Sequence, residues 1–223
     1  MAEELLVMCP ESSSAYALLA QTHLMDYWYG SGKSAQESVE KGIEMARKAI
    51  ALDDAYFWPH CLLSHFYTQK REYEKSLAEA ERAVALDPNA ADVHAWYALS
   101  LTFSGRPEEA VSLFQTAIRS NPFGPAWYFF NLGNALGNTG RFEEAVSAYK
   151  KAFQRSPDSL LSHVFLTATY SMMGREREAR AEAAEVLRID PKFSADYFAK
   201  NLTYKDQRVT TNLIDALRKA GLK

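Results

Sequence analysis

The stretch that decides the fold is GRPEEAVSLFQTAIRSNP, at residues 105–122. Similar segments follow it, GRFEEAVSAYKKAFQRSP at 140–157 and GREREARAEAAEVLRIDP at 174–191. Each begins with glycine, continues as an alanine-containing amphipathic stretch and ends with proline. The closing prolines stand 34, 35 and 34 residues apart, at Pro88, Pro122, Pro157 and Pro191. A nearly fixed period of this length indicates a repeat array.

The residue types within the period predict a helix–turn–helix unit. Gly105, Gly140 and Gly174 supply the backbone freedom that a tight turn between two helices needs. Arg71 stands at this position in the copy that ends at Pro88. Small residues after the turn let the paired helices approach closely, and the proline ends the second helix. Because one hairpin cannot bury its own apolar stripe, neighbouring copies must stack to form the core.

These motifs resemble the tetratricopeptide repeat family. The resemblance implies an all-α fold, a right-handed superhelical solenoid of helix-turn-helix repeats with a C-terminal capping helix. We expect residues 1–12 to be the tail of a truncated preceding repeat and residues 194–223 to be the cap. The first of the five expected repeats is irregular, with an insertion, GSGKSAQESV, at 30–39. The repeats are expected at 13–56, 57–90, 91–125, 126–159 and 160–193.

Composition excludes several classes of function. An apolar fraction of 48% is enough to build a core. A net charge of −3 leaves no basic surplus for a phosphate backbone, so nucleic acid is not an expected partner. No stretch approaches 18 consecutive apolar residues, and the acidic start lacks the order of a signal peptide. We therefore expect a cytoplasmic chain without membrane insertion. Cys9 and Cys61 are isolated, which predicts structural roles for both.

The residues that could carry chemistry have structural explanations. All five histidines fall on expected first helices, where His60, His94 and His163 share one repeat position, too far apart to bind one metal ion. Acidic pairs follow the turns, where they suit a helix N-terminus. We predict no catalytic residue, no cofactor and no metal. An enzyme built on repeats would need an additional α/β domain, which the remaining residues cannot supply.

The segment NLGNALGNTG, at residues 131–140, has the composition of a phosphate-binding loop. It contains neither GxxxxGK[ST] nor GxGxxG, and the repeat register places it at the end of a first helix. Gly133 falls where the paired helices approach, and Gly140 forms the turn. Gly137 has no structural explanation in the sequence.

The family resemblance also implies which residues bind a partner. In tetratricopeptide proteins, six positions of each first helix line a concave groove. Of the thirty corresponding positions, only Asp92 is charged. A clamp of lysines and arginines around a peptide carboxylate is therefore not expected. A groove of aromatic and aliphatic residues with an asparagine row remains, which indicates an interaction surface. The predicted groove residues are Trp58, Leu62, His65, Trp96, Leu99, Phe103, Trp127, Asn131, Asn134, Asn138 and Phe165.

Two interpretations of these residues stay open. The aromatic side chains either face a ligand or pack between adjacent first helices and under the C-terminal cap. Asn131, Asn134 and Asn138 stand at i, i+3 and i+7 on one helix face, where their amides either hold the backbone of a bound peptide or face solvent.

Three longer segments carry a more specific resemblance. They are AYALLAQTHLMDYWYGSGKSAQESVEKGIEMARKAIALDD at 15–54, NPFGPAWYFFNLGNALGNTGRFEEAV at 121–146 and FAKNLTYKDQRVTTNLIDALRKAGL at 198–222. Together they are similar to the C-terminal tetratricopeptide region of bacterial class III adenylate/guanylate cyclases. The resemblance implies a regulatory signalling module that binds a peptide, a partner helix or a second copy, with the catalytic domain upstream. The alternative is a free-standing scaffold or assembly adaptor.

Overall fold

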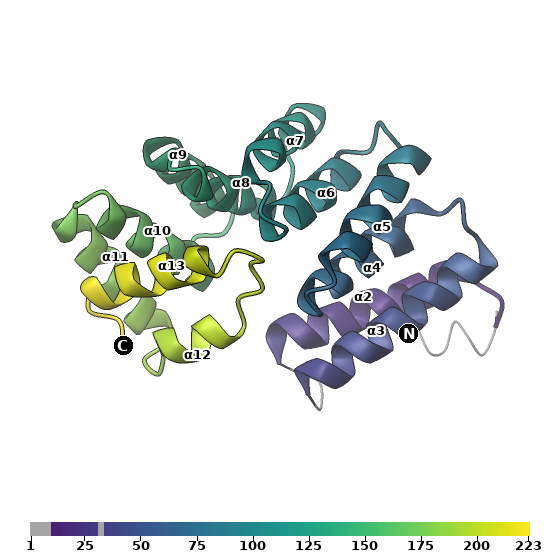
Figure 1. Ribbon diagram of the computed structural model, residues 1–223, viewed down its shortest axis with the longest axis horizontal. Helices are drawn as coiled ribbons and strands as arrows, with labels where there is room; N and C mark the ends of the chain where they lie inside the picture. Colours follow the sequence, from purple (N-terminus) through teal and green to yellow (C-terminus); the bar gives the residue numbers. More distant parts are fainter. Residues whose placement is uncertain (1–9, 31–33) are drawn as a thin grey trace. The chain divides into compact units, whose positions relative to one another are not determined.

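The computed structural model describes residues 10–30 and 34–223, and these residues form twelve α-helices and no β-strand (Figure 1). The predicted all-α fold is therefore confirmed for this part of the chain. Two compact units, residues 1–100 and 101–223, meet within helix α6 (Ala91–Phe103). Of the predicted N-terminal tail, residues 1–9 lie outside the described residues, and so does Cys9.

Unit 1 contains two helical hairpins and most of α6. One pairs α2 (Ser13–Tyr29) with α3 (Ala35–Leu52), and the other pairs α4 (Phe57–Gln69) with α5 (Tyr73–Leu86). The two helices of the first pair have 17 and 18 residues, against 13 and 14 in the second. The helices of the first pair are thus about one turn longer, and residues 35–39 of the expected insertion belong to α3.

Local capping explains why the insertion becomes helical. Gly30 adopts a left-handed conformation, φ 64°, and ends α2. The Ser34 hydroxyl then accepts a hydrogen bond from the Glu37 backbone N–H at 3.1 Å and starts α3. A serine cap of this kind satisfies one of the unpaired N–H groups of a first turn. The inserted residues from Ala35 onward therefore continue as helix.

Unit 2 contains two further hairpins and a C-terminal helical segment. Helix α7 (Pro107–Ser120) follows α6 and packs on α8 (Ala126–Asn138). Helix α8 pairs with α9 (Phe142–Phe153), and α10 (Leu160–Met172) pairs with α11 (Glu176–Ile189). The short α12 (Ala195–Lys200) and the amphipathic α13 (Gln207–Lys219) complete the chain. Helix α13, yellow in Figure 1, packs on α10.

The turn between paired helices repeats one backbone geometry. Gly105, Gly140 and Gly174 have φ values of 84°, 77° and 74°. Arg71, predicted to replace glycine, has φ 59° and is the only described non-glycine residue with positive φ. In a residue with a Cβ this conformation costs about 1–2 kcal/mol, which explains why glycine occupies the other three turns.

Neighbouring helices pack tightly at glycine, both within a hairpin and between successive hairpins. A Cβ on Gly133 of α8 would lie 2.6 Å from the Tyr149 ring of α9, and the Tyr149 side chain is buried. Gly42 of α3 meets the buried Phe66 ring of α4 in the same way. Gly137, four residues after Gly133, has no neighbouring atom within 4 Å of a Cβ. The two glycines of α8 therefore differ in their packing constraint.

This difference predicts opposite effects of alanine at two positions of one helix. Gly133→Ala forces the buried Tyr149 ring to move and is expected to lower the free energy of unfolding by about 1–3 kcal/mol. Gly137→Ala adds helix propensity without a clash and is expected to raise it by about 0.5–1 kcal/mol. Urea unfolding of both variants measures the two changes in the free energy of unfolding. Equal changes would contradict the different packing of Gly133 and Gly137.

Candidate partner-binding surfaces

Four aromatic rings from three successive first helices meet in unit 1. They belong to Trp28 of α2, Trp58 and His65 of α4, and Trp96 of α6, and we call them the tryptophan cluster. Trp28 lies parallel to Trp96 with ring centroids 6.4 Å apart. Trp58 and His65 meet the Trp96 ring edge-on at 5.9 and 5.3 Å. Such edge-to-face pairs add about 0.5–1.5 kcal/mol beyond area burial.

Exposure varies sharply across the tryptophan cluster. The Trp96 side chain is buried and Trp58 is half-buried, whereas Trp28 is 47% exposed. Of the other predicted groove residues in this unit, Leu62 and Leu99 are buried. The cluster thus has a packed base and one broad indole surface that a partner can reach.

His65 is a buried neutral histidine within the cluster. Its Nε2 accepts a hydrogen bond from the Gln69 amide at 3.1 Å, and the Gln69 oxygen accepts one from the Tyr27 hydroxyl at 2.6 Å. Its Nδ1 has no hydrogen-bond partner among the described residues. Burial lowers the pKa of His65 to about 4 because a charged imidazolium loses its hydration there.

The lowered pKa of His65 predicts an acid-sensitive unit 1. In the unfolded chain the pKa is about 6.5, so the unfolded state binds more protons between pH 6.5 and 4. The contribution of neutral His65 to stability is present above pH 6.5 and is lost as the pH falls through that window. We expect it to account for about 2 kcal/mol of the stability difference between pH 7 and pH 5.

Urea unfolding of the wild type and His65→Gln at both pH values isolates this contribution. Glutamine keeps a polar side chain but does not titrate, so the variant should lose less stability on acidification than the wild type. An identical pH dependence in the two proteins would contradict the assignment.

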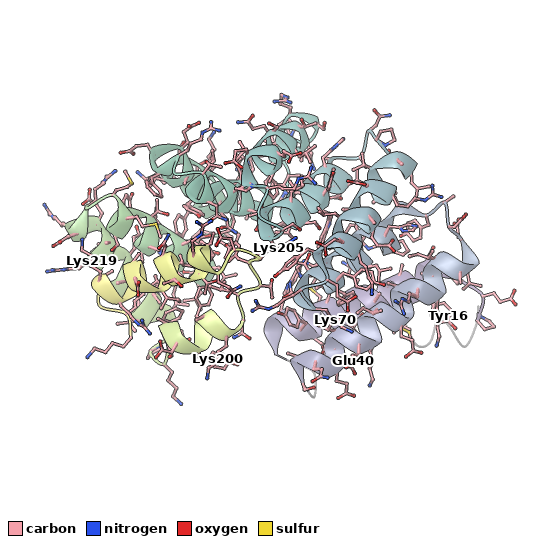
Figure 2. All side chains as sticks on the ribbon, viewed as in Figure 1. Tyr16, Glu40, Lys70, Lys200, Lys205 and Lys219 are labelled. Carbon is pink, nitrogen blue, oxygen red and sulfur yellow. The ribbon has the colours of Figure 1, made fainter. Side chains whose placement is uncertain are left out.

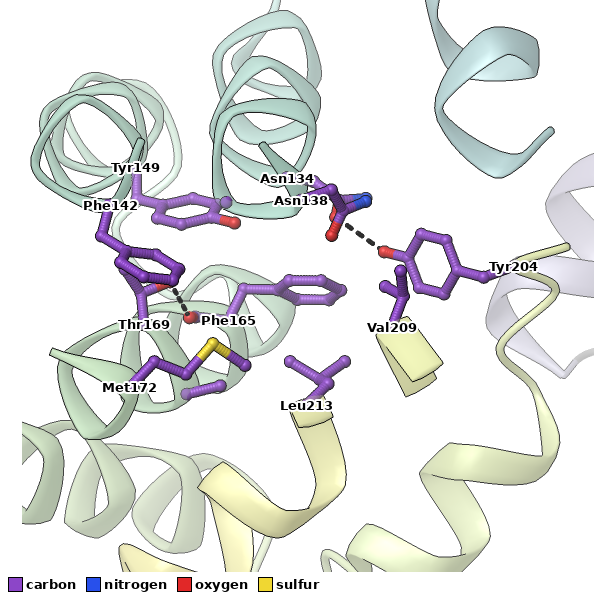
Figure 3. Close-up of a pocket in the computed structure, with 12 residues that line it drawn as sticks. Asn134, Asn138, Phe142, Tyr149, Phe165, Thr169, Met172, Tyr204, Val209 and Leu213 are labelled. Carbon is purple, nitrogen blue, oxygen red and sulfur yellow. Dashed lines mark hydrogen bonds between the residues drawn. The ribbon is translucent and has the colours of Figure 1, made fainter. Parts of the chain in front are cut away.

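In unit 2, residues of the chain's own C-terminal segment lie against the predicted groove residues. The Tyr204 hydroxyl donates to Asn134 Oδ1 at 2.6 Å (Figure 3). The Tyr204 ring stacks on Phe103 with centroids 4.7 Å apart. The Lys205 backbone N–H donates to the Phe103 carbonyl at 2.8 Å. Burial raises the pKa of the Tyr204 hydroxyl, and its hydrogen bonds to Asn134 and Asn138 act in the opposite direction.

A small pocket remains beside Tyr204. Its cavity of about 30 Å³ has room for a water molecule or two. Asn134, Asn138 and the Tyr204 hydroxyl provide its polar side, as Figure 3 shows. The largest apolar side chains of its lining are Phe142, Tyr149, Phe165, Met172, Val209 and Leu213. Residues of α8, α9, α10, α13 and the segment before α13 thus enclose this small pocket together.

The three asparagines of the predicted row have different environments. Asn131 is buried, and its amide donates to the Trp127 carbonyl of the same helix at 2.9 Å. Asn134 is buried and engaged by Tyr204, whereas Asn138 is half-buried at the pocket. Trp127 is half-buried and meets the Tyr128 ring edge-on. Ligand contact by this row thus stays a prediction, and Asn138 is the member with exposed surface beside the pocket.

Sequence reasoning missed two contributors to these surfaces. Trp28 lies in the lengthened part of α2, outside the positions that the family pattern assigns to the groove. Tyr204 belongs to the non-repeating end of the chain, where no periodicity places it. The one available signal was NLTYKDQ, residues 201–207, which separates two helical segments and contains an aromatic residue.

Two of the histidines that share a repeat position lie beside an acidic side chain of the paired helix. His60 and His163 place Nδ1 at 2.6 and 2.7 Å from Glu79 and Glu182 on the paired second helix. Within residues 10–30 and 34–223, no group of three or more His, Cys, Asp or Glu side chains is placed to hold a metal ion. Over the same residues, no helix is long and apolar enough to cross a bilayer.

Family models for tetratricopeptide repeats match residues 64–125, 100–159 and 139–200. The chain belongs to the tetratricopeptide repeat family. The matched residues run continuously from within α4 to the end of α12, so they include most of the second hairpin of unit 1 and both hairpins of unit 2.

Curated relatives of the repeat region are much longer proteins. Anaphase-promoting complex subunit 3 of Schizosaccharomyces pombe is 22% identical over 210 residues, which cover 93% of this chain and 30% of that protein. A small glutamine-rich tetratricopeptide repeat-containing protein 2 of Mycosarcoma maydis is 26% identical over 119 residues, or 53% of this chain and 33% of that protein. The chain thus spans about a third of the length of these relatives.

Solved structures share the fold. PilW, a type IV pilus biogenesis factor, superposes with a TM-score of 0.71 at 18% identity, over 93% of this chain and 90% of that chain. PilF of Pseudomonas aeruginosa superposes with a TM-score of 0.68 at 18% identity, over 95% of this chain and 90% of that chain. YrrB, described as a tetratricopeptide protein with an unusual peptide-binding site, superposes with a TM-score of 0.56 at 19% identity. The superposition covers 91% of this chain and 98% of that chain.

Proposed function

We propose that this tetratricopeptide protein is a non-catalytic interaction scaffold that binds a protein or peptide partner through the tryptophan cluster of unit 1. The observation that carries the proposal is Trp28, whose broad indole surface is 47% exposed while it lies parallel to the buried Trp96. Tryptophan is enriched among the residues that dominate binding energy at interfaces. A ring held in place by packed neighbours also loses little entropy on binding.

The chemistry of the cluster favours an apolar segment of the partner. Trp28, Trp58 and Trp96 offer aromatic faces and edges, and the buried His65 is neutral near pH 7. These groups do not provide the positive charge that recognition of a peptide carboxylate requires. A partner segment with aliphatic or aromatic side chains, either extended or helical, fits this surface. The peptide-binding site named for YrrB supports the proposal by analogy of fold.

We further propose that the chain is the regulatory C-terminal region of a bacterial class III cyclase acting in the cytoplasm. Support comes from the resemblance of segments 15–54, 121–146 and 198–222, and the interaction with a peptide, helix or second copy would adjust the upstream enzyme. A free-standing scaffold is the alternative and rests on the fold alone. The natural reading frame decides between them, since a cyclase domain encoded upstream is required by the first and excluded by the second.

Trp28→Ala is predicted to weaken partner binding without unfolding the chain. Peptides selected from a displayed random library against the wild-type protein should be rich in aliphatic and aromatic residues. Their affinity for Trp28→Ala, measured by fluorescence anisotropy, should fall at least about tenfold, which corresponds to about 1.4 kcal/mol.

Trp127→Ala is the matched control, because it removes a half-buried tryptophan from unit 2. The selected peptides should bind this variant as they bind the wild type. Equal losses in both variants, or a selection that yields no binding peptide, would contradict the assignment of the tryptophan cluster.

A further inference from the structure

The segment between α12 and α13 is buried although it has no regular secondary structure. Leu202, Thr203 and Tyr204 follow one another in non-helical backbone, and all three are buried. The next residue, Lys205, is exposed (Figure 2). Loops normally run over the surface, because buried backbone groups must find hydrogen-bond partners. This loop is therefore held against the helices of its own unit by specific contacts.

Those contacts are of the kinds that recognise a peptide. A side-chain amide, Asn134, accepts from the Tyr204 hydroxyl, and an aromatic ring, Phe103, stacks on the Tyr204 ring. A main-chain carbonyl, also of Phe103, accepts from the Lys205 backbone N–H. Both Phe103 and Asn134, together with Asn138, belong to the groove predicted from the repeat register. We call Phe103, Asn134 and Asn138 the tyrosine site.

Capping of the repeat array does not by itself require this arrangement. A terminal cap needs an apolar face, and α13 supplies one with the buried Leu213, Ile214 and Leu217 as it packs on α10. Tyr204 lies before α13 and reaches α8, where its hydroxyl meets a polar partner. A phenylalanine would cover the same apolar area. The hydroxyl and its amide partner therefore add specificity beyond coverage.

We propose that the tyrosine site is a second peptide-binding surface, that it takes an extended segment carrying a tyrosine, and that residues 202–205 occupy it as an intramolecular ligand. A partner segment of the same chemistry displaces them. The site uses other helices than the tryptophan cluster, so it extends the proposed function and can fail independently of it.

The anchoring of the flanking helices makes such an exchange local. Helix α13 packs on α10 and α12, and the Ala195 backbone N–H at the start of α12 donates to the Lys223 carbonyl at 2.9 Å. Displacement of Tyr204 leaves these contacts in place. Because the internal segment is tethered, it competes with an external peptide at high effective concentration. The apparent affinity for the external peptide equals the intrinsic affinity multiplied by the fraction of molecules in which the site is open.

The test supplies the segment in trans to the full chain. The probe is a fluorescein-labelled peptide with the sequence of residues 199–208, AKNLTYKDQR, acetylated and amidated. In Tyr204→Ser the internal tyrosine is gone, so this variant should bind the probe at least about tenfold more tightly than the wild type. A probe with alanine in place of its tyrosine should not bind.

Recognition of the hydroxyl has its own control. Tyr204→Ser should bind the tyrosine probe several-fold more tightly than a phenylalanine probe, and adding Asn134→Ala should reduce that preference, because only Asn138 then remains to bind the hydroxyl. Trp28→Ala, which tests the tryptophan cluster, should leave binding of these probes unchanged. Failure at one surface is thereby distinguished from failure at the other.

Two results would overturn the proposal. One is a folded Tyr204→Ser variant, shown by its circular dichroism melting curve, that binds the tyrosine and alanine probes equally or binds neither. If this variant does not fold, Tyr204→Phe takes its place, because it keeps the ring stacked on Phe103 and loses only the hydroxyl with its hydrogen bonds to Asn134 and Asn138. Tyr204→Phe should then bind the tyrosine probe more tightly than the wild type does. Equal affinity of this variant and the wild type for the probe is the second result that would overturn the proposal.

Discussion

The close approach of neighbouring helices is the constraint on which the rest of this structure depends. Gly133 lets α8 lie against the Tyr149 ring of its paired helix α9, and Gly42 lets α3 lie against the Phe66 ring of α4 in the next hairpin. Each hairpin is thin enough for its remaining apolar stripe to face the next hairpin, and stacking buries what one hairpin leaves exposed. The geometry leaves a row of first helices whose outward side chains are not needed for pairing.

The outward side chains of the first helices have different surroundings in the two units. In unit 1, Trp28, Trp58 and Trp96 form an aromatic surface with one broadly exposed ring. In unit 2, Tyr204 contacts α8 and helix α13 packs on α10, with a small pocket between them. One repeat scaffold thus presents two surfaces of different chemistry, an open aromatic one and a polar one that the chain itself fills.

Much of the fold was predictable because its signals repeat along the chain. The prolines and turn glycines set the period, and even Arg71 takes the left-handed conformation of the glycine it replaces. The insertion at 30–39 stays a prediction, and residues 35–39 of it belong to α3. Serine capping at Ser34 favours that outcome, but the contacts that stabilise a longer helix are tertiary.

The sequence by itself determined the helical hairpins, their turns and the set of side chains on the first helices, because all of these follow from a local period. Only the tertiary structure decided which of those side chains are engaged. Asn134 receives its hydrogen bond from Tyr204, 70 residues away, and Trp28 joins Trp96 from a lengthened helix. Such pairings depend on the path of non-repeating segments, for which the repeat register holds no information.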